Sequence, residues 1–363
     1  MLDMRDYCMP PTDAEAVALL TDMVSLYGPS TQEQEVARLI VETMARWGYQ
    51  AEIDASGNAV GHLGEGKPEI ILLGHMDTVP GEIPVRREGD LLYGRGTVDA
   101  KGPLAAFIVA AARAAAASAQ ARVTVIGAVE EECTSSKGAH YAAGRYQPAY
   151  AIIGEPSAWN RITLGYKGRL LVDYTLEHPM SHTAGQERGV CEEAVDYWLR
   201  LRGWAEAFNH GKSARFDTLD PSLRSISSSS DGLRERMEMH IGLRLPLGLD
   251  IESFLRELET WRGPAEVRTY AREQPFRAEK SNPLTSAFLS AIRAEGGKAA
   301  FVTKTGTSDM NVLGPRWGCP IVAYGPGDSA LDHTPEEHMA LNEYLAAIRV
   351  LTRVLKRLVK PTP

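Results

Sequence analysis

The sequence is poor in cysteine, has no excess of basic residues and contains no long apolar run. The four cysteines are scattered and include no C-x-x-C pair, which argues against a disulfide framework. With 39 basic against 47 acidic residues the net charge is −8, which argues against nonspecific binding to nucleic acid or to a membrane. No apolar run approaches the roughly 20 residues that span a bilayer, and the start, MLDMRDYCMPP, lacks the apolar core of a signal peptide. We therefore expect a cytoplasmic protein.

What is present is typical of a globular chain with two domains. The length of 363 residues exceeds the roughly 250–300 residues at which single hydrophobic cores stop growing. The hydrophobic content of 44% and the mean hydropathy of −0.22 are ordinary for soluble proteins and can fill a sizeable core.

Apolar strands alternate with helices up to about residue 165. The expected helices are 13–27, 33–46, 102–119 and 137–144, and the expected strands are 51–53, 59–63, 70–73, 123–129 and 149–153. Continuously apolar strands in this order predict a buried, mostly parallel sheet covered by helices on both faces. The pattern resumes from residue 282, with helices at 283–295 and 335–359 and strands at 300–303 and 321–324.

Between residues 166 and 275 the pattern changes. The strands expected there are 170–176, 223–227, 237–245 and 265–270, and the helices are 189–208 and 251–261. Their order is βαββαβ, which forms a compact unit with its own core. The sequence therefore predicts a mixed, mostly parallel α/β domain built from residues 1–165 and 276–363, with an α+β domain, 166–275, inserted into it.

Histidine and acidic residues stand where predicted strands end, the usual place of a site in an open α/β sheet. His75 follows an apolar strand, and Asp77 lies two residues on, where its carboxylate can accept the second imidazole N–H and orient the ring for a metal. Asp99 lies in the glycine-rich segment GRGTVDAKG, which lacks the frame of a phosphate-binding loop. A structural histidine and a favourable charge at a helix N-terminus are the alternatives.

Carboxylates follow the next two strands, and another histidine precedes the last predicted helix. Glu130, Glu131 and Glu132 end one strand, where adjacent carboxylates repel one another unless a cation relieves them. Glu155 ends the next strand, and His333 lies in the segment DHTP. Each residue alone has a structural explanation. Together they provide the nitrogen and oxygen ligands of a zinc site, with enough carboxylates for two ions that share one of them.

The chain resembles the M20 zinc metallopeptidases. The segments that carry the resemblance stand in the family's order and are GHMDTVP, YGRGTVDAKG, AVEEECTSSKGA, IIGEPS and DHTPEE. The similarity extends over nearly the whole chain, and the βαββαβ insertion resembles that family's lid and dimerisation domain. The resemblance implies a zinc-exopeptidase-like fold, a homodimer joined through the lid, and amide hydrolysis with two Zn²⁺ ions per subunit, for which Co²⁺ is a possible substitute.

The resemblance also implies which residues hold the metal ions. The five expected ligands are His75, Asp99, Glu132, Glu155 and His333. Asp99 would bridge the two ions and be followed by a cis peptide bond. His75 and Glu155 would complete the first site, and Glu132 and His333 the second. Asp77 would orient His75, and His338 is the alternative to His333.

By the same resemblance Glu131 would be the general base, which takes a proton from water and passes it to the leaving amine. The two cations would lower the pKa of that water and polarise the scissile carbonyl. Alignment of the triple glutamate on Lys137 and Gly138 favours this register. A shift that makes Glu130 the base and Glu131 the ligand is the alternative.

Four further residues match positions that contact substrate in relatives. His182 matches the lid histidine, which in relatives reaches the neighbouring subunit's site and stabilises an oxyanion; a surface-loop histidine is the alternative. Arg244, Gly306 and Thr307 match positions that hold a substrate carboxylate, a task that suits the forked guanidinium. Arg244 could equally form an ion pair at a strand end.

Within the family, the chain most resembles hydrolases of lysine or arginine biosynthesis that release lysine or ornithine from the C-terminal glutamate γ-carboxyl of an acidic amino-group carrier protein. The predicted lid has no excess of basic residues, which gives this partner no independent support. The alternatives are a deacylase of acetylornithine or another N-acyl amino acid, and a noncatalytic binding module on the same fold. Zinc, cobalt and manganese accept similar ligands, so the metal stays open.

Overall fold

The computed structural model describes residues 9–115, 121–180, 182 and 188–359. It divides into two compact units, each with its own hydrophobic core. Unit 1 comprises residues 1–165, 277–303 and 308–363, and unit 2 comprises residues 166–276 and 304–307. The N-terminal segment, the end of the helix expected at 102–119 and most of the loop around His182 lie outside the described residues. None of the helices in the described part of the chain is long and apolar enough to cross a membrane.

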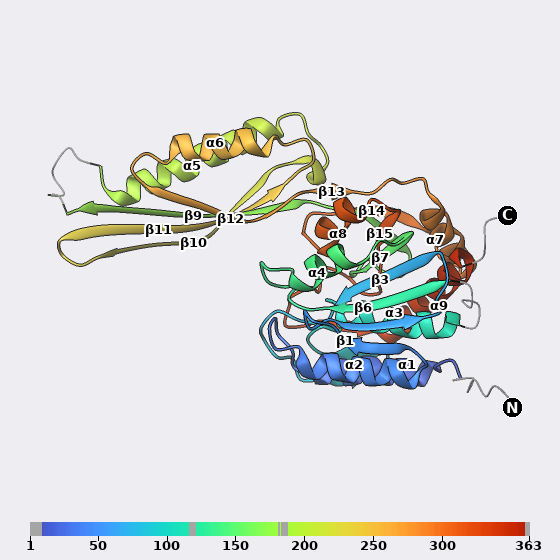
Figure 1. Cartoon of the computed structure of the whole chain (residues 1–363). Helices are drawn as coiled ribbons and strands as arrows, with labels where there is room; N and C mark the ends of the chain where they lie inside the picture. The colour runs from blue at the N-terminus through green and yellow to red at the C-terminus, as the bar shows by residue number, and fades with distance from the viewer. Residues whose placement is uncertain (1–8, 116–120, 181, 183–187, 360–363) are drawn as a thin grey trace, which may run out of the picture. The chain divides into compact units, whose positions relative to one another are not determined.

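Unit 1 is built on a nine-stranded sheet in the order β1-β2-β6-β3-β7-β15-β8-β13, with β14 paired to β8 (Figure 1). Its strands are β1 (Gln50–Ile53), β2 (Ala59–Leu63), β3 (Glu69–His75), β6 (Arg122–Ala128), β7 (Tyr150–Gly154), β8 (Arg161–Tyr166), β13 (Phe276–Arg277), β14 (Ala300–Lys304) and β15 (Ile321–Ala323). The central strands β6, β3, β7 and β15 run parallel, whereas β2 is antiparallel to β1 and β6, and β8 is antiparallel to β15. The predicted mixed α/β fold is therefore confirmed.

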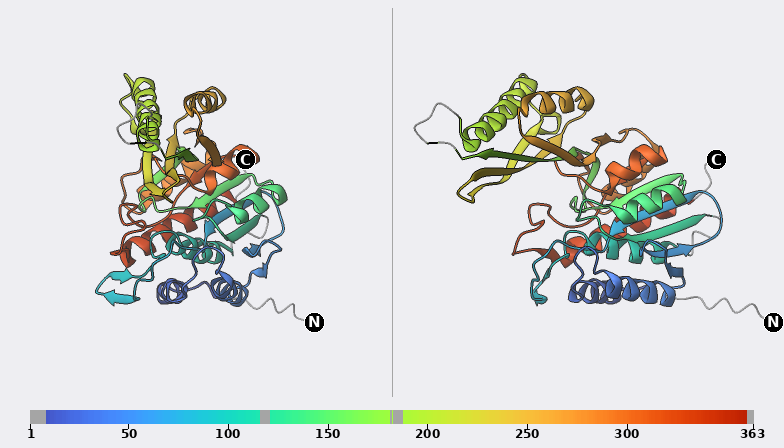
Figure 2. Two further views of the ribbon diagram at one scale, coloured as in Figure 1. Left: turned by 90° about the vertical axis from the view of Figure 1, so that its left-hand side faces the viewer. Right: turned by 60° about the vertical axis from the view of Figure 1, so that its left-hand side comes forward.

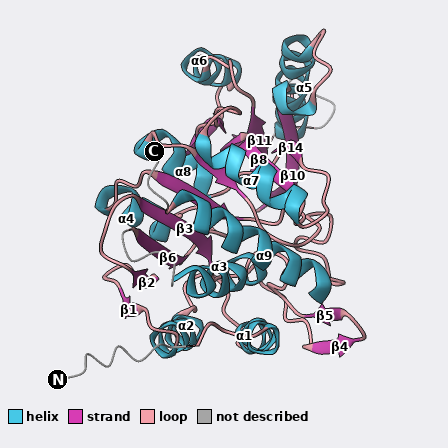
Figure 3. Cartoon of the chain, turned by 90° about the vertical axis from the view of Figure 1, so that its right-hand side faces the viewer, coloured by secondary structure: helices cyan, strands magenta, loops and turns pink. Residues whose placement is uncertain are grey.

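Helices cover both faces of this sheet, because its central strands are apolar on both sides. The helices are α1 (Asp13–Ser25), α2 (Gln34–Arg46), α3 (Lys101–Ala114), α4 (Lys137–Arg145), α7 (Pro283–Ala294), α8 (Asp309–Trp317) and α9 (Leu341–Leu358). Figure 3 shows α3, α7 and α9 along one face and α4 and α8 along the other. Nearly every residue of α3 is buried, since its alanines allow close packing between the sheet and α9.

The end of unit 1 differs from the prediction at two places. The last helix begins at Leu341, not at residue 335, because residues 338–340 form β16 (His338–Ala340), which pairs with β5 (Leu91–Tyr93). With β4 (Arg86–Glu88), these strands form a small separate sheet. The pairing joins segments far apart in the chain, so local helical periodicity does not reveal it. The helix α8 was not expected, because it contains Gly314 and Pro315, which disfavour helix.

Unit 2 has the expected element order βαββαβ. Its elements are β9 (Gly168–Pro179), α5 (Val190–Asn209), β10 (Asp220–Ser230), β11 (Arg234–Leu245), α6 (Ile251–Trp261) and β12 (Glu266–Glu273). The strands form an antiparallel sheet in the order β10-β11-β9-β12. The helices α5 and α6 lie on one face of it (Figure 1 and Figure 2), where Met237, Met239 and Ile241 of β11 are buried. Alternate residues of β11 therefore supply the core of this unit.

We expect Phe254→Ala to destabilise unit 2 by about 3–5 kcal/mol, because the ring is fully buried and packs on Trp204 with centroids 4.7 Å apart. Ile226→Ala is the matched control, since that side chain is 45% exposed and its removal should change stability by less than about 0.5 kcal/mol. Chemical denaturation followed by tryptophan fluorescence measures both. Equal losses for the two variants would contradict the assigned core.

Candidate metal centre

The predicted ligands of unit 1 gather at one edge of its sheet. His75 is the last residue of β3, the triple glutamate follows β6, and Glu155 follows β7. These three strands are adjacent and parallel, so their carboxyl ends lie at the same edge. Asp99 precedes α3, and His333 lies in the loop before β16. Five segments far apart in the sequence thus meet at one place.

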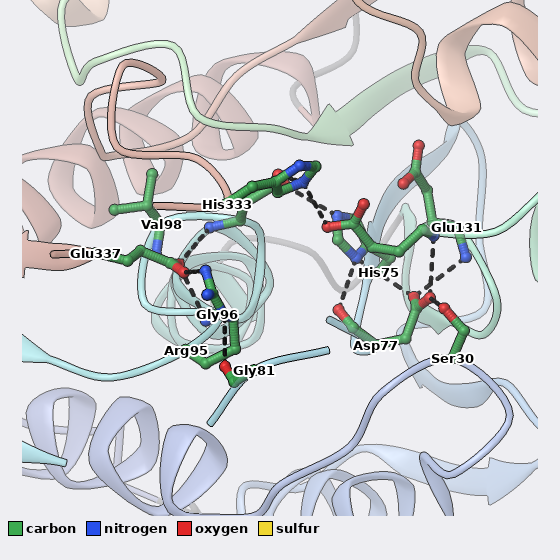
Figure 4. Close-up of polar contacts among 12 residues, drawn as sticks. Ser30, His75, Asp77, Gly81, Arg95, Gly96, Val98, Glu131, His333 and Glu337 are labelled. Carbon is green, nitrogen blue, oxygen red and sulfur yellow. Dashed lines mark hydrogen bonds and ion pairs between the residues drawn. The ribbon is translucent and has the colours of Figure 1, made fainter. Parts of the chain in front are cut away.

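Asp77 connects two of these segments. The Nδ1 atom of His75 lies 3.0 Å from the carbonyl oxygen of Asp77 and 3.4 Å from its carboxylate. That carboxylate also accepts the backbone N–H groups of Glu131 and Glu132, at 3.1 and 3.0 Å, and the hydroxyl of Ser30 at 2.7 Å (Figure 4). Asp77 therefore fixes both the imidazole and the backbone that carries the glutamates.

Asp99 lies between the two histidines. Its Oδ1 is 3.2 Å from Nε2 of His75, and its Oδ2 is 3.0 Å from Nε2 of His333. The peptide bond between Asp99 and Ala100 is cis, as the family resemblance implies. A carboxylate with one oxygen toward each histidine has the arrangement that a bridging ligand requires.

Among the residues that the structure describes, two groups of side chains have their ligand atoms within 4.8 Å of one another. One group is His75, Glu131 and Glu132, and the other is Asp99, Glu132 and His333. Nitrogen and carboxylate oxygen are donors that zinc accepts, and both groups include Glu132, so the residues fit two neighbouring divalent ions. Glu155 belongs to neither group, although its side chain is buried and the charges of Asp99 and His75 affect its pKa.

The three consecutive glutamates point in different directions. Glu130 accepts a hydrogen bond from the Ser135 hydroxyl at 2.6 Å and lies 3.4 Å from the ammonium of Lys137. Glu131 and Glu132 instead belong to the groups around the histidines. Residue 130 has a φ of 60°, and this local turn separates its side chain from the two that follow.

The electrostatics of the cluster suit a cation. Burial raises the pKa of Glu131 and of Glu155 well above the usual value, and repulsion from Asp309 adds to the effect in both, while His75 opposes it. Hydrogen bonds to Asp99 and Glu132 raise the pKa of His333 to about 10. The carboxylates of Asp99 and Glu132 thus favour the protonated His333 imidazole, and the carboxylates of the cluster repel one another. Divalent ions would relieve both effects.

Glu337 supports the cluster, and sequence reasoning missed it. Its buried carboxylate accepts the backbone N–H groups of Gly96, Val98 and Asp99 at 2.9–3.2 Å. It also pairs with Arg95 at 2.8 Å (Figure 4). Glu336 and Glu337 stand side by side in DHTPEE, and nothing in that pattern tells the buried one from the exposed one. Glu33 was missed too; it is buried and accepts the N–H of Glu130 at 3.1 Å.

Glu337→Gln should lower metal affinity or kcat/KM about 10–100-fold, because the amide replaces one of two acceptor oxygens that hold the Asp99 segment. Glu336→Gln is the control, since this neighbouring side chain is exposed. Isothermal titration with Zn²⁺ and steady-state kinetics measure the two effects. If both variants behaved like the unmodified chain, Glu337 would have no part in positioning Asp99.

The other predicted residues lie elsewhere. His338 belongs to β16, where its ring packs on Tyr93 and its Nδ1 lies 2.7 Å from the carbonyl of Glu336, so it is not one turn inside a helix as expected. His182, Arg244, Gly306 and Thr307 belong to unit 2. His182 is exposed, and Arg244 donates a hydrogen bond to the hydroxyl of Thr307 at 3.2 Å.

An α/β sheet with histidines and carboxylates at its carboxyl edge, arranged for two ions, defines a class of metal-dependent hydrolases. Residues 71–357 match the model of peptidase family M20/M25/M40, and the chain belongs to this family. It is 46% identical over 359 residues to a LysW-lysine hydrolase of Deinococcus radiodurans, with 96% of this chain and 99% of that protein covered.

A more distant relative and a solved structure are also similar to this chain over nearly its full length. The LysW-lysine/LysW-ornithine hydrolase of Saccharolobus solfataricus is 28% identical over 344 residues, which cover 95% of this chain and 96% of the relative. The crystal structure of an M20 family metallo-carboxypeptidase from Sulfolobus solfataricus superposes with a TM-score of 0.78 at 18% identity, over 95% of this chain and 99% of that one. At this identity, the match to the solved structure supports the fold alone.

Proposed function

We propose that the chain is a metal-dependent hydrolase that releases lysine, ornithine or both from the C-terminal glutamate γ-carboxyl of an acidic amino-group carrier protein. The observation that carries this proposal is the 46% identity to a LysW-lysine hydrolase over nearly the full length of both chains. The grouping of histidines and carboxylates in unit 1 supports the hydrolytic part independently of that name.

We assign the metal ligands as His75, Asp99, Glu132, Glu155 and His333. Asp99 would hold both ions, because its two oxygens face the two histidines. Zn²⁺ is the proposed ion and Co²⁺ a substitute, since both accept nitrogen and oxygen ligands. When bound, such ions lower the pKa of water and polarise a carbonyl. Asp77 keeps His75 in the orientation that ligation requires.

Glu131 is the proposed general base. Its carboxylate lies beside His75 and Glu132. The backbone N–H of Glu131 donates to the Asp77 carboxylate at 3.1 Å, which fixes the backbone from which the Glu131 side chain extends. It takes a proton from the attacking water and passes it to the departing α-amino group, which leaves as a neutral amine. The position of Glu130 against Ser135 and Lys137 favours this register over the shifted one.

Unit 2 is the proposed lid. His182 would stabilise the tetrahedral oxyanion, and Arg244 with Gly306 and Thr307 would hold a substrate carboxylate, as the family resemblance implies. The hydrogen bond between Arg244 and Thr307 supports their joint use. We also propose that the chain forms a homodimer joined through the lid, which sedimentation velocity of the purified chain tests. The proposed location is the cytoplasm.

The decisive experiment incubates the Zn²⁺-loaded chain with the carrier protein charged with lysine or with ornithine. Intact-mass spectrometry should show that the carrier loses the mass of the amino-acid residue. The free amino acid should appear at the same rate and in the same amount. Acetylornithine is the parallel substrate and should be deacetylated far more slowly. Rapid deacetylation of acetylornithine without release from the carrier would replace this proposal with the deacylase; no turnover of either would favour a binding module.

A further inference from the structure

A cavity of about 220 Å³ lies in unit 1 beside the loops that carry the metal cluster, but its lining residues include none of the proposed ligands. Its walls come from the end of α1 and the residues after it, from the segment that follows Asp77, and from the GRGTVDAKG segment before α3. One water needs only about 10–15 Å³, so the cavity can hold something larger.

Two buried polar groups of this cavity are poorly satisfied by the protein. Lys101 is 1% exposed and donates to the carbonyl oxygen of Leu26 at 2.7 Å; no carboxylate of the described residues lies within 4.0 Å of its ammonium. An ammonium has three N–H donors, so two remain for another acceptor. The hydroxyl of Thr78, also 1% exposed, has no hydrogen-bond partner within the described part of the chain.

The other charged groups of the cavity are already paired or face water. Arg95 donates to Glu337 at 2.8 Å and to the carbonyl oxygen of Gly81 at 2.9 Å (Figure 4). Glu82, the carboxylate among the lining residues that the structure describes, is exposed. The Gly81 backbone N–H donates to the Tyr27 hydroxyl at 3.2 Å, so the loop that closes the cavity is held from both sides. Among the charged groups of the cavity that the structure describes, Lys101 is therefore the one that is buried without a direct ion pair, since Asp77 and Glu337 attract its ammonium only from a greater distance.

Burying a charged or polar group without a partner costs free energy, and an anion at that place offsets the cost. We propose that this cavity binds a small carboxylate, whose oxygens accept from the Lys101 ammonium and the Thr78 hydroxyl. Val24 and Ile83 line the rest of the cavity and contact the alkyl part. Because Thr78 follows Asp77 and Lys101 follows Asp99 by two residues, the bound anion braces both segments that carry the metal cluster.

The carboxylate can come from a simple acid or from an amino acid, and thermal unfolding of the metal-loaded chain separates the two. The midpoint is measured in sodium acetate, in L-lysine and in sodium chloride at equal ionic strength. We expect a saturable rise of roughly 2–6 °C with acetate, with L-lysine or with both, but not with chloride. Equal rises with acetate and chloride, or no rise with any of them, would overturn the carboxylate assignment.

Carboxylates also bind metal ions, so variants must locate the effect. Thr78→Val removes the unpartnered hydroxyl and should weaken the response at least about tenfold in concentration, while the unliganded midpoint stays the same or rises. Thr43→Val is the control, because this buried hydroxyl on α2 accepts a hydrogen bond from Arg46 and lies outside the cavity. Equal responses of the two variants would reject the site.

Lys101→Met, with the exposed Lys298→Met as its control, gives the same comparison if Thr78→Val does not fold. The response to the carboxylate that raised the midpoint should disappear in Lys101→Met alone. A crystal structure with that same carboxylate supplies a direct readout: its density between Lys101 Nζ and Thr78 Oγ1 supports the proposal, and only ordered water there contradicts it.

Discussion

Glu131→Gln should lower kcat at least about 1,000-fold and leave the metal content of the chain unchanged. Glutamine has nearly the same shape but cannot accept the proton of the attacking water, and general-base catalysis contributes about 100- to 10,000-fold. Because Glu131 is the proposed base and not a ligand, two ions per chain should remain. Release of lysine from the charged carrier gives the rate, and inductively coupled plasma mass spectrometry gives the metal content.

Glu130→Gln is the matched control for this variant. Its carboxylate contacts Ser135 and Lys137 and belongs to neither group of ligand atoms, so its rate should stay within about threefold of the unmodified chain. The pair also decides the register of the triple glutamate. An inactive Glu130→Gln that keeps both ions, beside a Glu131→Gln that loses metal, would assign the base to Glu130 and make Glu131 a ligand.

Asp99→Asn should remove at least one of the two metal ions and lower kcat/KM by roughly 1,000-fold or more. The two oxygens of Asp99 face His75 and His333 at 3.2 and 3.0 Å, so the loss of one anionic oxygen affects both proposed sites. A metal ion contributes several kcal/mol of transition-state stabilisation, which corresponds to a loss of this size. Metal content and carrier hydrolysis again provide the measurements.

Asp328→Asn is the control for Asp99→Asn, since Asp328 is exposed and caps a turn by accepting the N–H of Ala330 at 3.0 Å. It should retain both ions. Circular dichroism must show that Asp99→Asn is folded, because its carboxylate lies in a packed part of unit 1. A folded Asp99→Asn with two ions and an unchanged rate would remove Asp99 from the bridging position.

The fold could be predicted from local patterns because those patterns have a direct physical cause. Apolar runs such as 70–73 belong to central strands that are buried on both faces, and the residues after them lie at one edge of the sheet. The change of pattern was expected at residues 165/166 and 275/276, and the structure divides at Gly165/Tyr166 and Phe276/Arg277. Residues 304–307, predicted to lie in the catalytic domain, instead belong to unit 2. The role of the inserted unit as a lid remains a prediction.

What the sequence did not reveal depends on contacts between distant segments. β16 becomes a strand only because β5 pairs with it, so residues 338–340 have no local signal. Glu337 is buried because Arg95 and three backbone N–H groups surround it, and a sequence shows only two glutamates in a row. The directions of Glu130, Glu131 and Glu132 likewise follow from one left-handed residue, which composition does not encode.

The hydrogen bond from the Asp99 N–H to Glu337 joins residues 238 positions apart, and this has a consequence for biosynthesis. During translation the N-terminal strands and the inserted unit leave the ribosome long before residues 333–337 do, and domains generally fold as they emerge. Until then the Asp99 segment lacks both the Glu337 carboxylate that orders it and the imidazole of His333. A nascent chain stalled before residue 333 should therefore take up little zinc, and metal loading becomes a step that follows completion of the polypeptide.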